Sequence, residues 1–294
     1  MNIAFLACAQ TLPGAPNRRA DAFEHDEQIA ALRSGLAGSG VDVIDIDWRV
    51  PIDTLIGFPL ALIGTAWDYT DHPTEFLYTL DAMEAAGVTV CNAAQVVRWN
   101  SDKSYLQHLA AAGAVSIPTI WHDDPGEADV TAAFAEFGTD RVVVKRRVGA
   151  GALGQYSFCK GDAALDGWQM GHAAMIQPFL PAIQTEGEYS FIFVDGGFSH
   201  ALIKQAAAGD YRIQSLYGGS ETPIDPHSAD IATAQSILEM LPFDEEPLYA
   251  RIDMVRRSDG KLAVIEAELI EPYLYPLQDA GFGKRLAQAV LARL

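Results

Sequence analysis

The chain has little of what would tie it to an oxidising compartment or a membrane. Its 294 residues include only three cysteines, Cys8, Cys91 and Cys159, an odd number at spacings that no metal knuckle uses. We therefore expect reduced thiols in a cytoplasmic protein. No basic segment precedes the short apolar run at the N-terminus, and the longest apolar stretch, residues 55–67, is interrupted by two glycines and a proline. We therefore expect the N-terminal run to be a first β-strand rather than a signal peptide, and we expect no membrane-spanning helix in the apolar stretch.

Positive charge is also scarce. The formal net charge is -19, and the longest run of basic residues is the triplet Lys145-Arg146-Arg147. A protein of this sign repels nucleic acid and anionic membranes, so neither is an expected partner. An isolated cationic site suits a small anion such as a nucleotide phosphate. The seven histidines show no ligand spacing, and no order of Ser, His and Asp stands out.

The sequence does contain a clear change, along the chain, in the pattern of apolar residues. The first part alternates apolar runs at residues 3–7, 41–46, 60–64 and 88–91 with helical patterns at 21–36 and 74–86. This βαβ pattern predicts a small parallel sheet. Further helices are expected at 102–112 and 130–137. Strand patterns then dominate, at residues 142–145, 155–159, 174–177, 188–194 and 198–204. A helix at 227–241, a hairpin of 248–256 with 261–268, and a final amphipathic helix at 279–294 follow. The predicted fold class is a parallel α/β unit followed by two α+β units.

The segment Gly149 to Gly154 matches the pattern G-x-G-x-x-G and has two interpretations. If it opened a helix after a strand, it would be a dinucleotide-binding turn, and the chain would be an NAD-dependent dehydrogenase. The residues after Gly154 are strand formers without a helix cap, which favours a flap between antiparallel strands. Glycines let the backbone N–H groups of such a flap lie close to a triphosphate. Lys145, four residues before the flap, is placed to reach the same phosphates.

The C-terminal hairpin carries three carboxylates, Asp253, Glu266 and Glu268. Side chains two residues apart on a strand share a face, and a two-residue turn at Ser258-Asp259 places all three on the same face as Arg251. The opposite face then carries Ile252, Met254 and Ile265. Carboxylates so close together need compensation, either by Mg²⁺ that bridges them to ATP phosphates or by solvent and Arg251.

Together these features resemble the ATP-grasp superfamily, in particular glutathione synthetase, the ribosomal-protein glutamate ligases and D-alanine:D-alanine ligase. The resemblance covers residues 99–273 and implies an ATP-grasp fold behind an N-terminal parallel α/β domain. The implied domains are a substrate-side domain at 1–98, a central subdomain with the flap at 99–185, and a subdomain with the metal site at 186–294. The implied cofactors are ATP and two Mg²⁺ ions, with Mn²⁺ as an alternative.

The resemblance also implies a role for particular residues. The implied ATP contacts are Lys103, Lys145, Gly149, Gly151, Gly154, Gln177, Phe179, Leu180 and Glu188. The implied metal ligands are Asp253, Glu266 and Glu268, where Glu268 replaces the asparagine of the usual E-x-N motif. Lys204 and Arg212 are the implied catalytic cations. For the substrate we expect Trp67, Asp68, Tyr69, Arg251 and Glu271, because the first three follow a strand of the leading domain, where α/β sheets bind ligands.

The implied reaction is a two-step ligation in which ATP phosphorylates a carboxylate and an amine displaces the phosphate, joining carbon to nitrogen on a small amino-acid-like substrate. The motifs around Trp67, Trp99 and Tyr273 resemble the branch that contains the cyclo-ligase closing O-ureido-serine to cycloserine, which is an alternative reaction. A catalytically silent nucleotide-binding module is a further alternative, beside the dehydrogenase. A homodimer is the default expectation for assembly.

Overall fold

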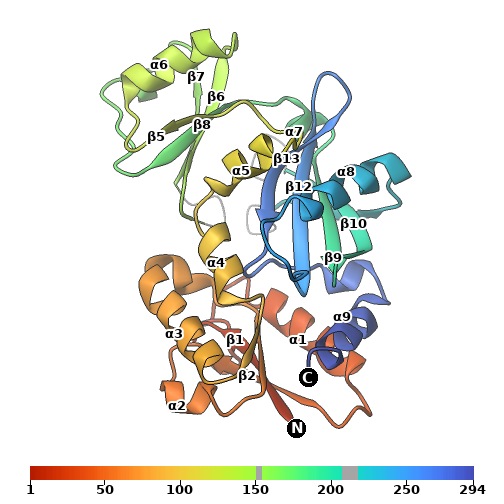
Figure 1. Cartoon of the computed structure of the whole chain (residues 1–294). Coiled ribbons are helices and arrows are strands. Elements are labelled where there is room, and N and C mark those ends of the chain that lie inside the picture. The colour runs from red at the N-terminus through yellow and green to blue at the C-terminus, as the bar shows by residue number, and fades with distance from the viewer. Residues whose placement is uncertain (150–153, 207–217) are drawn as a thin grey trace.

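The computed structural model of the chain describes residues 1–149, 154–206 and 218–294 and contains three separate sheets. The first is parallel, with the strand order β2-β1-β3-β4. Its strands are β1 (Asn2–Ala7), β2 (Asp42–Asp47), β3 (Leu60–Ile63) and β4 (Thr89–Cys91). The helices of this unit are α1 (Phe23–Gly35), the short α2 (Ile52–Leu55), the 3-10 helix η1 (Trp67–Asp71), α3 (Pro73–Ala85) and α4 (Ala94–Asn100). The predicted βαβ unit is confirmed, and it forms the lower part of Figure 1.

Local sequence explains the boundaries of α3. Pro73 occupies the first helical position, where its missing N–H group costs nothing, and Gly87 follows the helix with a φ of 91°. Phe76, Leu80 and Met83 recur on one face of α3 and are fully buried. The helix therefore seals one side of the parallel sheet, together with the buried Trp48 and Leu55.

The second sheet is antiparallel and has the order β5-β8-β6-β7. Its elements are β5 (Ile120–His122), α6 (Glu127–Glu136), β6 (Arg141–Arg146), β7 (Gln155–Cys159), the 3-10 helix η2 (Ala163–Leu165) and β8 (Ala174–Pro178). The residues after Gly154 thus form a strand that pairs with β6, with Lys145 opposite Gln155. This arrangement contradicts the dinucleotide-turn interpretation, which required a helix at Gly154.

The third sheet has the order β11-β10-β9-β12-β13. Its strands are β9 (Glu188–Val194), β10 (Gly197–Gln205), β11 (Ser220–Ile224), β12 (Tyr249–Arg256) and β13 (Leu262–Glu268). One face packs against α5 (Tyr105–Ala111) and α8 (Ser228–Glu239), which bury Phe191, Ile252 and Met254. Beside the sheet lies the short helix α7 (Ala182–Thr185). The short elements α2, α4, α7 and β11 were not predicted.

The chain ends with the 3-10 helix η4 (Pro276–Gln278) and with α9 (Phe282–Leu291), which returns to the first unit and packs against α1. The two helices approach closely at glycines: a Cβ atom on Gly35 would lie 2.1 Å from the carbonyl oxygen of Gly283. Both chain ends consequently lie in the lower part of the molecule (Figure 1). No described helix has the length and apolarity needed to cross a membrane.

Candidate active site

A cavity of about 640 Å³ is lined by residues of the second and third sheets and by connections and helices of the first unit. Its volume is in the range of ligand-binding pockets. The described residues of the predicted site that line it are Trp67, Asp68, Tyr69, Lys103, Lys145, Gly149, Gln177, Phe179, Leu180, Glu188, Lys204, Arg251, Asp253, Glu266, Glu268 and Glu271. Gly154 does not line it; this residue has a φ of 68° and a Cβ atom there would collide with Arg146. Gly151 and Arg212 lie outside the described residues.

The hairpin of β12 and β13 carries the predicted carboxylates on one face, but its turn and its register differ from those predicted. The turn has three residues, 258–260, because Arg257 and Lys261 are the last paired residues. That turn alone would place Glu266 on the opposite face. A bulge at Ile265 restores the predicted side, so that Asp253 lies opposite Glu266 and Arg251 opposite Glu268.

The expectation of a two-residue turn is therefore wrong, and so is the position of Ile265. Ile252 and Met254 do cover the far face, in the core formed with α5 and α8. Ile265 instead lines the cavity and packs against the small cluster that includes Val255. The extra residue of a bulge is free to point to either side because it has no partner across the ladder.

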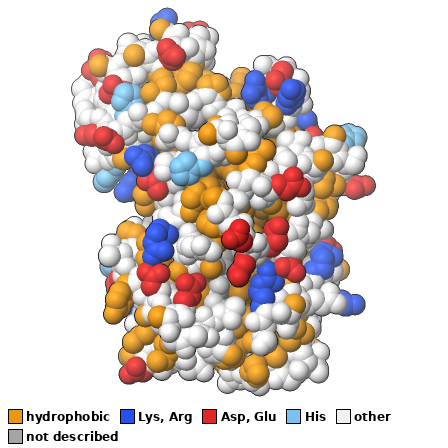
Figure 2. Space-filling view, in the orientation of Figure 1, with side chains coloured by type: hydrophobic (Ala, Val, Ile, Leu, Met, Phe, Trp, Pro, Cys, Tyr) orange, Lys and Arg blue, Asp and Glu red, His pale blue; other side chains and the backbone are white. Residues whose placement is uncertain are grey.

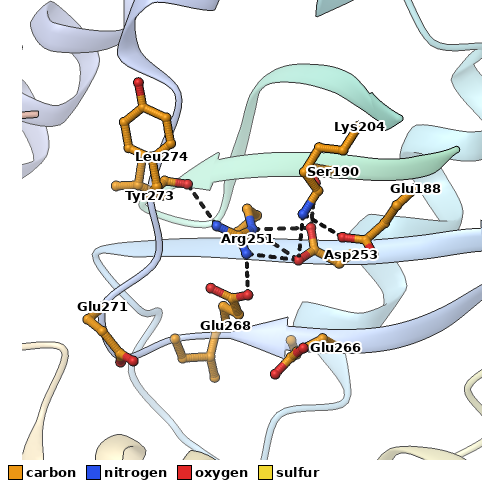
Figure 3. Close-up of polar contacts among 12 residues, drawn as sticks. Glu188, Ser190, Lys204, Arg251, Asp253, Glu266, Glu268, Glu271, Tyr273 and Leu274 are labelled. Atoms are coloured by element: carbon orange, nitrogen blue, oxygen red, sulfur yellow. Dashed lines mark hydrogen bonds and ion pairs between the residues drawn. The ribbon is translucent and has the colours of Figure 1, made fainter. Parts of the chain in front are cut away.

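Asp253 is the centre of a buried ionic network (Figure 3). It is 2% exposed, and both of its oxygens accept from Arg251 Nε, at 3.1 and 3.0 Å. Lys204 Nζ lies 3.2 Å from Asp253 Oδ2 and also contacts Glu188, and the Ser190 hydroxyl donates to Asp253 Oδ1. Burial alone would raise the pKa of Asp253, but the charges of Arg251 and Lys204 outweigh it and lower the pKa to about 2.

Arg251 links this network to the backbone and to the other strand of the hairpin. Its guanidinium also contacts Glu268 and donates to the carbonyl oxygen of Tyr273 at 3.0 Å. Figure 3 shows Arg251 between Asp253 on one side and Glu268 on another, with Glu271 apart from them. Arg251 was predicted to bind substrate, yet its donors are largely used inside the protein. It holds the site carboxylates in place.

Lys103 and Lys145 approach the carboxylates from the other side of the cavity. Lys103 Nζ contacts Glu266 and donates to the carbonyl oxygen of Gly149 at 3.0 Å. Lys145 has no ion pair with any described residue, although it lies in the same cavity. Burial lowers the pKa of Lys145, while the charges of Glu266 and Glu188 oppose this effect and that of Lys103 adds to it. Among the described residues Lys145 is thus a cation without a direct ion pair, which leaves its ammonium group able to contact an incoming phosphate.

Burial raises the pKa of three carboxyl groups at the cavity above the usual range of glutamate. Burial, reinforced by the neighbouring acidic groups, raises the pKa of Glu271 to about 8. Burial likewise raises the pKa of Glu268 to about 7 and that of Glu24 to about 8. Binding of a cation near these groups would shift them towards the ionised form.

The donor set fits Mg²⁺ only in part. Within residues 1–149, 154–206 and 218–294, no three His, Cys, Asp or Glu side chains converge in an arrangement that holds a metal. Both oxygens of Asp253 accept from Arg251, Oδ1 also accepts from Ser190, and Oδ2 also accepts from Lys204. Among the described residues, Glu266 and Glu268 each contact a cation through Oε1. Of the three predicted ligands these two therefore have an oxygen left for an ion, and the protein's own cations supply part of the compensation that was assigned to metal.

The predicted substrate residues differ in how free they are. Asp68 accepts from Trp48 Nε1 and Arg49, both at 2.6 Å, so it serves the first unit's own structure. Tyr69 is 6% exposed and packs against Phe76. Trp67 is partly buried: its Nε1 donates to the carbonyl oxygen of Glu271 at 3.3 Å, and its ring lies 5.1 Å from the Arg19 guanidinium.

Sequence analysis did not identify four further residues at the cavity, Gln10, Arg19, Glu24 and Glu221, or the Ser190 that binds Asp253. Gln10, Arg19 and Glu24 belong to the connection after β1 and the start of α1, at the carboxyl edge where parallel sheets bind ligands. That rule could have found them. Ser190 stands two residues after Glu188 on β9 and so shares its face.

Comparisons with known proteins agree with this geometry. A family model described as the N-terminal domain of D-cycloserine synthetase DcsG matches residues 3–92. The chain is 27% identical over 285 residues to the cycloserine biosynthesis protein DcsG of Streptomyces lavendulae, which covers 92% of this chain and 94% of that protein.

Solved structures extend the similarity over the whole chain. The crystal structure of D-cycloserine synthetase DcsG superposes with a TM-score of 0.80 at 24% identity, covering 100% of this chain and 99% of the other. The ATP-grasp ligase PsnB, complexed with a precursor variant, Mg and ADP, gives 0.66 at 14% identity, covering 99% and 98%. With β6 and β7 antiparallel and Lys103 and Lys145 at one cavity, these matches show that the chain has the ATP-grasp fold and is similar in sequence to an ATP-grasp ligase.

Proposed function

We propose that the chain joins a carboxylate to an amine on a small amino-acid-like substrate, with ATP converted to ADP and phosphate. The observation that supports this most directly is Lys145, a partly buried cation with no ion pair among the described residues, beside Lys103 and at the same cavity as the carboxylates of β12 and β13. A cavity that has lysines without full pairing and carboxylates along its walls suits a nucleotide bound together with a divalent cation.

The proposed reaction has two steps. A substrate carboxylate oxygen attacks the γ-phosphorus of ATP, the bond to the β-phosphate oxygen breaks, and ADP leaves. The amine then attacks the carbonyl carbon of the acyl phosphate, loses a proton and expels phosphate. Lys103 and Lys145 would lie against the phosphates and neutralise charge as it develops, which is the main contribution that a protein makes to phosphoryl transfer.

Glu266 and Glu268 would hold Mg²⁺, which when bound neutralises phosphate oxygens and orients them for transfer. PsnB, one of the superposed ligases, was solved with Mg and ADP, which supports this assignment. Lys204 is bound to Glu188 and Asp253, so we assign it to holding the site in shape rather than to direct contact with the transferred group. Arg212 keeps its proposed catalytic role, and the cytoplasm is the proposed compartment.

A second candidate is the intramolecular version of the same chemistry, closure of O-ureido-serine to cycloserine. The relative from Streptomyces lavendulae aligns over 92% of this chain, and the family model of residues 3–92 covers the unit that supplies Trp67. In the cyclisation the nitrogen next to the side-chain oxygen attacks the activated carboxyl carbon of the same molecule and phosphate leaves. The bond from that nitrogen to the carbamoyl carbon is hydrolysed, which releases carbon dioxide and ammonia, so O-ureido-serine, ATP and water suffice.

An ADP-release assay separates the candidates. We expect magnesium-dependent ADP formation with O-ureido-serine alone if the chain cyclises, and only with a pair of amino acids if it joins two molecules. The matched control is the Lys145→Met variant, in which release should fall sharply. Absence of magnesium-dependent ADP with every amino acid, dipeptide and O-ureido-serine tested would contradict the ligase and favour a silent nucleotide-binding module.

A further inference from the structure

The outer edge of β13 pairs with the backbone of residues 115–116 at Val264, but at residues 267–269 it is closed by side chains. β13 is the last strand of its sheet, and its outward backbone groups would otherwise lack partners. The Asn100 side chain donates from Nδ2 to the carbonyl oxygen of Ala267 at 2.7 Å and accepts from the N–H of Leu269 at 2.9 Å. The Tyr105 hydroxyl accepts from the N–H of Ala267 at 2.9 Å. Together they replace a neighbouring strand over residues 267–269.

These bonds enclose the carboxylates of the cavity. Ala267 stands between Glu266 and Glu268, and Leu269 follows directly, so the three bonds hold the backbone on both sides of Glu268. Between Asn100 and Tyr105 lies Lys103, which contacts Glu266. One short segment therefore fixes the backbone that carries both glutamates and supplies the cation that binds one of them.

The burial of these side chains also strengthens their hydrogen bonds to the backbone. Asn100 is 8% exposed and Tyr105 is 2% exposed, so water cannot replace them. A buried backbone group that loses its hydrogen-bond partner costs the full free energy of its desolvation, so the strand shifts until the group regains a partner. Beyond this point β13 ends, and a bulge at Ile265 interrupts the ladder to β12 on the other side. The edge contacts are therefore the main restraint on the orientation of Glu268 on that side.

We propose that Asn100 and Tyr105 are positioning residues for the divalent cation that accompanies the nucleotide. They hold β13 so that Glu266 and Glu268 present their oxygens to the cavity, and loss of either weakens cation binding without removing a ligand. The inference rests on the proposed function, since Glu266 and Glu268 bind the ion only if the cavity binds a nucleotide with it.

Asn92 provides a matched control on the same sheet. It is 2% exposed, and its side chain also bonds backbone groups of both strands: it accepts from the N–H of Leu248 and donates to the carbonyl oxygens of Tyr249 and Leu269. Asn92 shares Leu269 with Asn100, but its other bonds hold Leu248 and Tyr249 at the start of β12. An alanine at either asparagine removes the same chemistry from the interior, but only Asn100 holds Ala267.

The experiment measures Mn²⁺ binding in the presence of ADP by electron paramagnetic resonance, with Mn²⁺ in place of Mg²⁺ because both prefer oxygen ligands. This readout needs no turnover. Removing an outer partner of a metal ligand typically costs about 10- to 100-fold in metal affinity, so we expect a loss of at least about 10-fold in Asn100→Ala. Tyr105→Phe, which removes only the hydroxyl, should shift in the same direction. Asn92→Ala should leave the Mn²⁺ affinity of the folded protein unchanged.

The outcomes distinguish the two proposals. Unfolding by urea, run on each variant, shows how much stability each has lost, and Tyr105→Phe keeps the test open if Asn100→Ala fails to fold. If the wild type binds Mn²⁺ with ADP but Asn100→Ala and Tyr105→Phe bind it as Asn92→Ala does, the two residues only support the fold and the inference is overturned. If the wild type binds neither ADP nor Mn²⁺, the proposed function is overturned and the inference with it.

Discussion

At the scale of single residues, the cationic side chains of the cavity differ in the ion pairs that they already form within the protein. Lys204 and Arg251 are each bound to two carboxylates, and Lys103 is bound to Glu266. Lys145 is partly buried at the cavity and has no ion pair among the described residues. The first group stabilises the apoprotein, whereas a partly desolvated charge without a direct partner costs stability until an anion arrives.

Lys145→Met should therefore separate binding from stability. We expect the free energy of unfolding to stay the same or rise, because a desolvated charge is replaced by an apolar side chain of similar length. The ATP dissociation constant should rise about 10- to 100-fold, since a hydrogen bond to a charged group contributes about 1.5–3 kcal/mol. Calorimetric titration with ATP and unfolding in urea check the two parts.

Lys204→Met is the contrasting variant. It leaves Glu188 and Asp253 buried without their shared cation, and breaking a buried ion pair costs about 3–5 kcal/mol. Arg98→Met, at an exposed pair with Asp81, should cost at most about 1 kcal/mol. Equal stability of the Lys145 and Lys204 variants would contradict the distinction drawn between them.

Glu271 makes the stability of the protein depend on pH. Its pKa in the folded protein is raised from 4.5 to about 8, chiefly by burial. A group with a raised folded pKa stabilises the protein fully below its unfolded pKa, and this contribution is lost as the pH rises through the folded value. Stability from Glu271 should thus decline between about pH 4.5 and pH 8, by at most about 1.4 kcal/mol for each pH unit.

Urea unfolding across this range in the wild type and in Glu271→Gln isolates the effect, because the other titrating groups are common to both proteins. The difference between the two stabilities should favour the wild type less and less as the pH rises. A difference that does not change with pH would show that Glu271 is ionised in the folded protein.

At the scale of elements, the β12–β13 hairpin decides whether the carboxylates share a face. Its three-residue turn requires Gly260, which has a φ of 81° and open space around the position of a Cβ atom. Gly260→Ala should therefore cost only the backbone penalty of a left-handed residue, about 1–2 kcal/mol. Gly260→Asn should cost less, because asparagine tolerates this conformation. Denaturation in urea measures both, and an alanine variant as stable as the asparagine variant would exclude a register-setting role for this turn.

The hairpin also shows how far the sequence could predict the site. The strands were predictable because alternation of apolar residues is a local signal, and the shared face of Glu266 and Glu268 followed from their spacing. The turn length and the bulge at Ile265 were not, because each depends on packing against residues such as Val255. The turn is one residue longer than predicted, and the bulge adds one more residue to β13. Together they shift the register by two residues, so the predicted face was right although the predicted register was wrong.

The ion-pair partners of the charged residues could not be predicted from the sequence, for a different reason. Lys103 and Glu266 are 163 residues apart, and Lys204 and Asp253 are 49 apart. No periodic pattern relates positions at such separations, since only the order of strands in the sheet brings them together. The sequence therefore predicted a carboxylate face that needed positive charge, but not that the protein supplies much of that charge itself.

At the scale of the whole molecule, the cavity depends on how the first unit is held against the rest of the chain. The cavity takes Trp67 from the first unit and Lys204 from the third sheet, so their relative position sets its width. Acidic side chains are spread over the outer face of the molecule, with a group near its middle (Figure 2). Repulsion among them opposes a compact arrangement, and apolar packing has to outweigh it.

Part of that packing is the contact of α9 with α1, which brings the last helix of the chain back onto the first. A Cβ atom on Gly283 would lie 2.3 Å from the carbonyl oxygen of Ala31, a backbone atom that cannot rotate away. Gly283→Ala gains up to about 1 kcal/mol in helix propensity, but overpacking of this kind costs about 1–3 kcal/mol. The cost of the clash should exceed the gain in helix propensity, so we expect the free energy of unfolding in urea to fall by about 1–2 kcal/mol.

The neighbouring Lys284→Ala, exposed on the same helix, is the control and should change stability by less than about 0.5 kcal/mol. Because the two helices must separate to admit the methyl group, the first unit should also shift relative to the third sheet. The ATP affinity of Gly283→Ala is then expected to fall although the substitution is remote from the cavity. A variant that loses stability but binds ATP as the wild type does would show that the α1–α9 contact supports the fold without setting the width of the site.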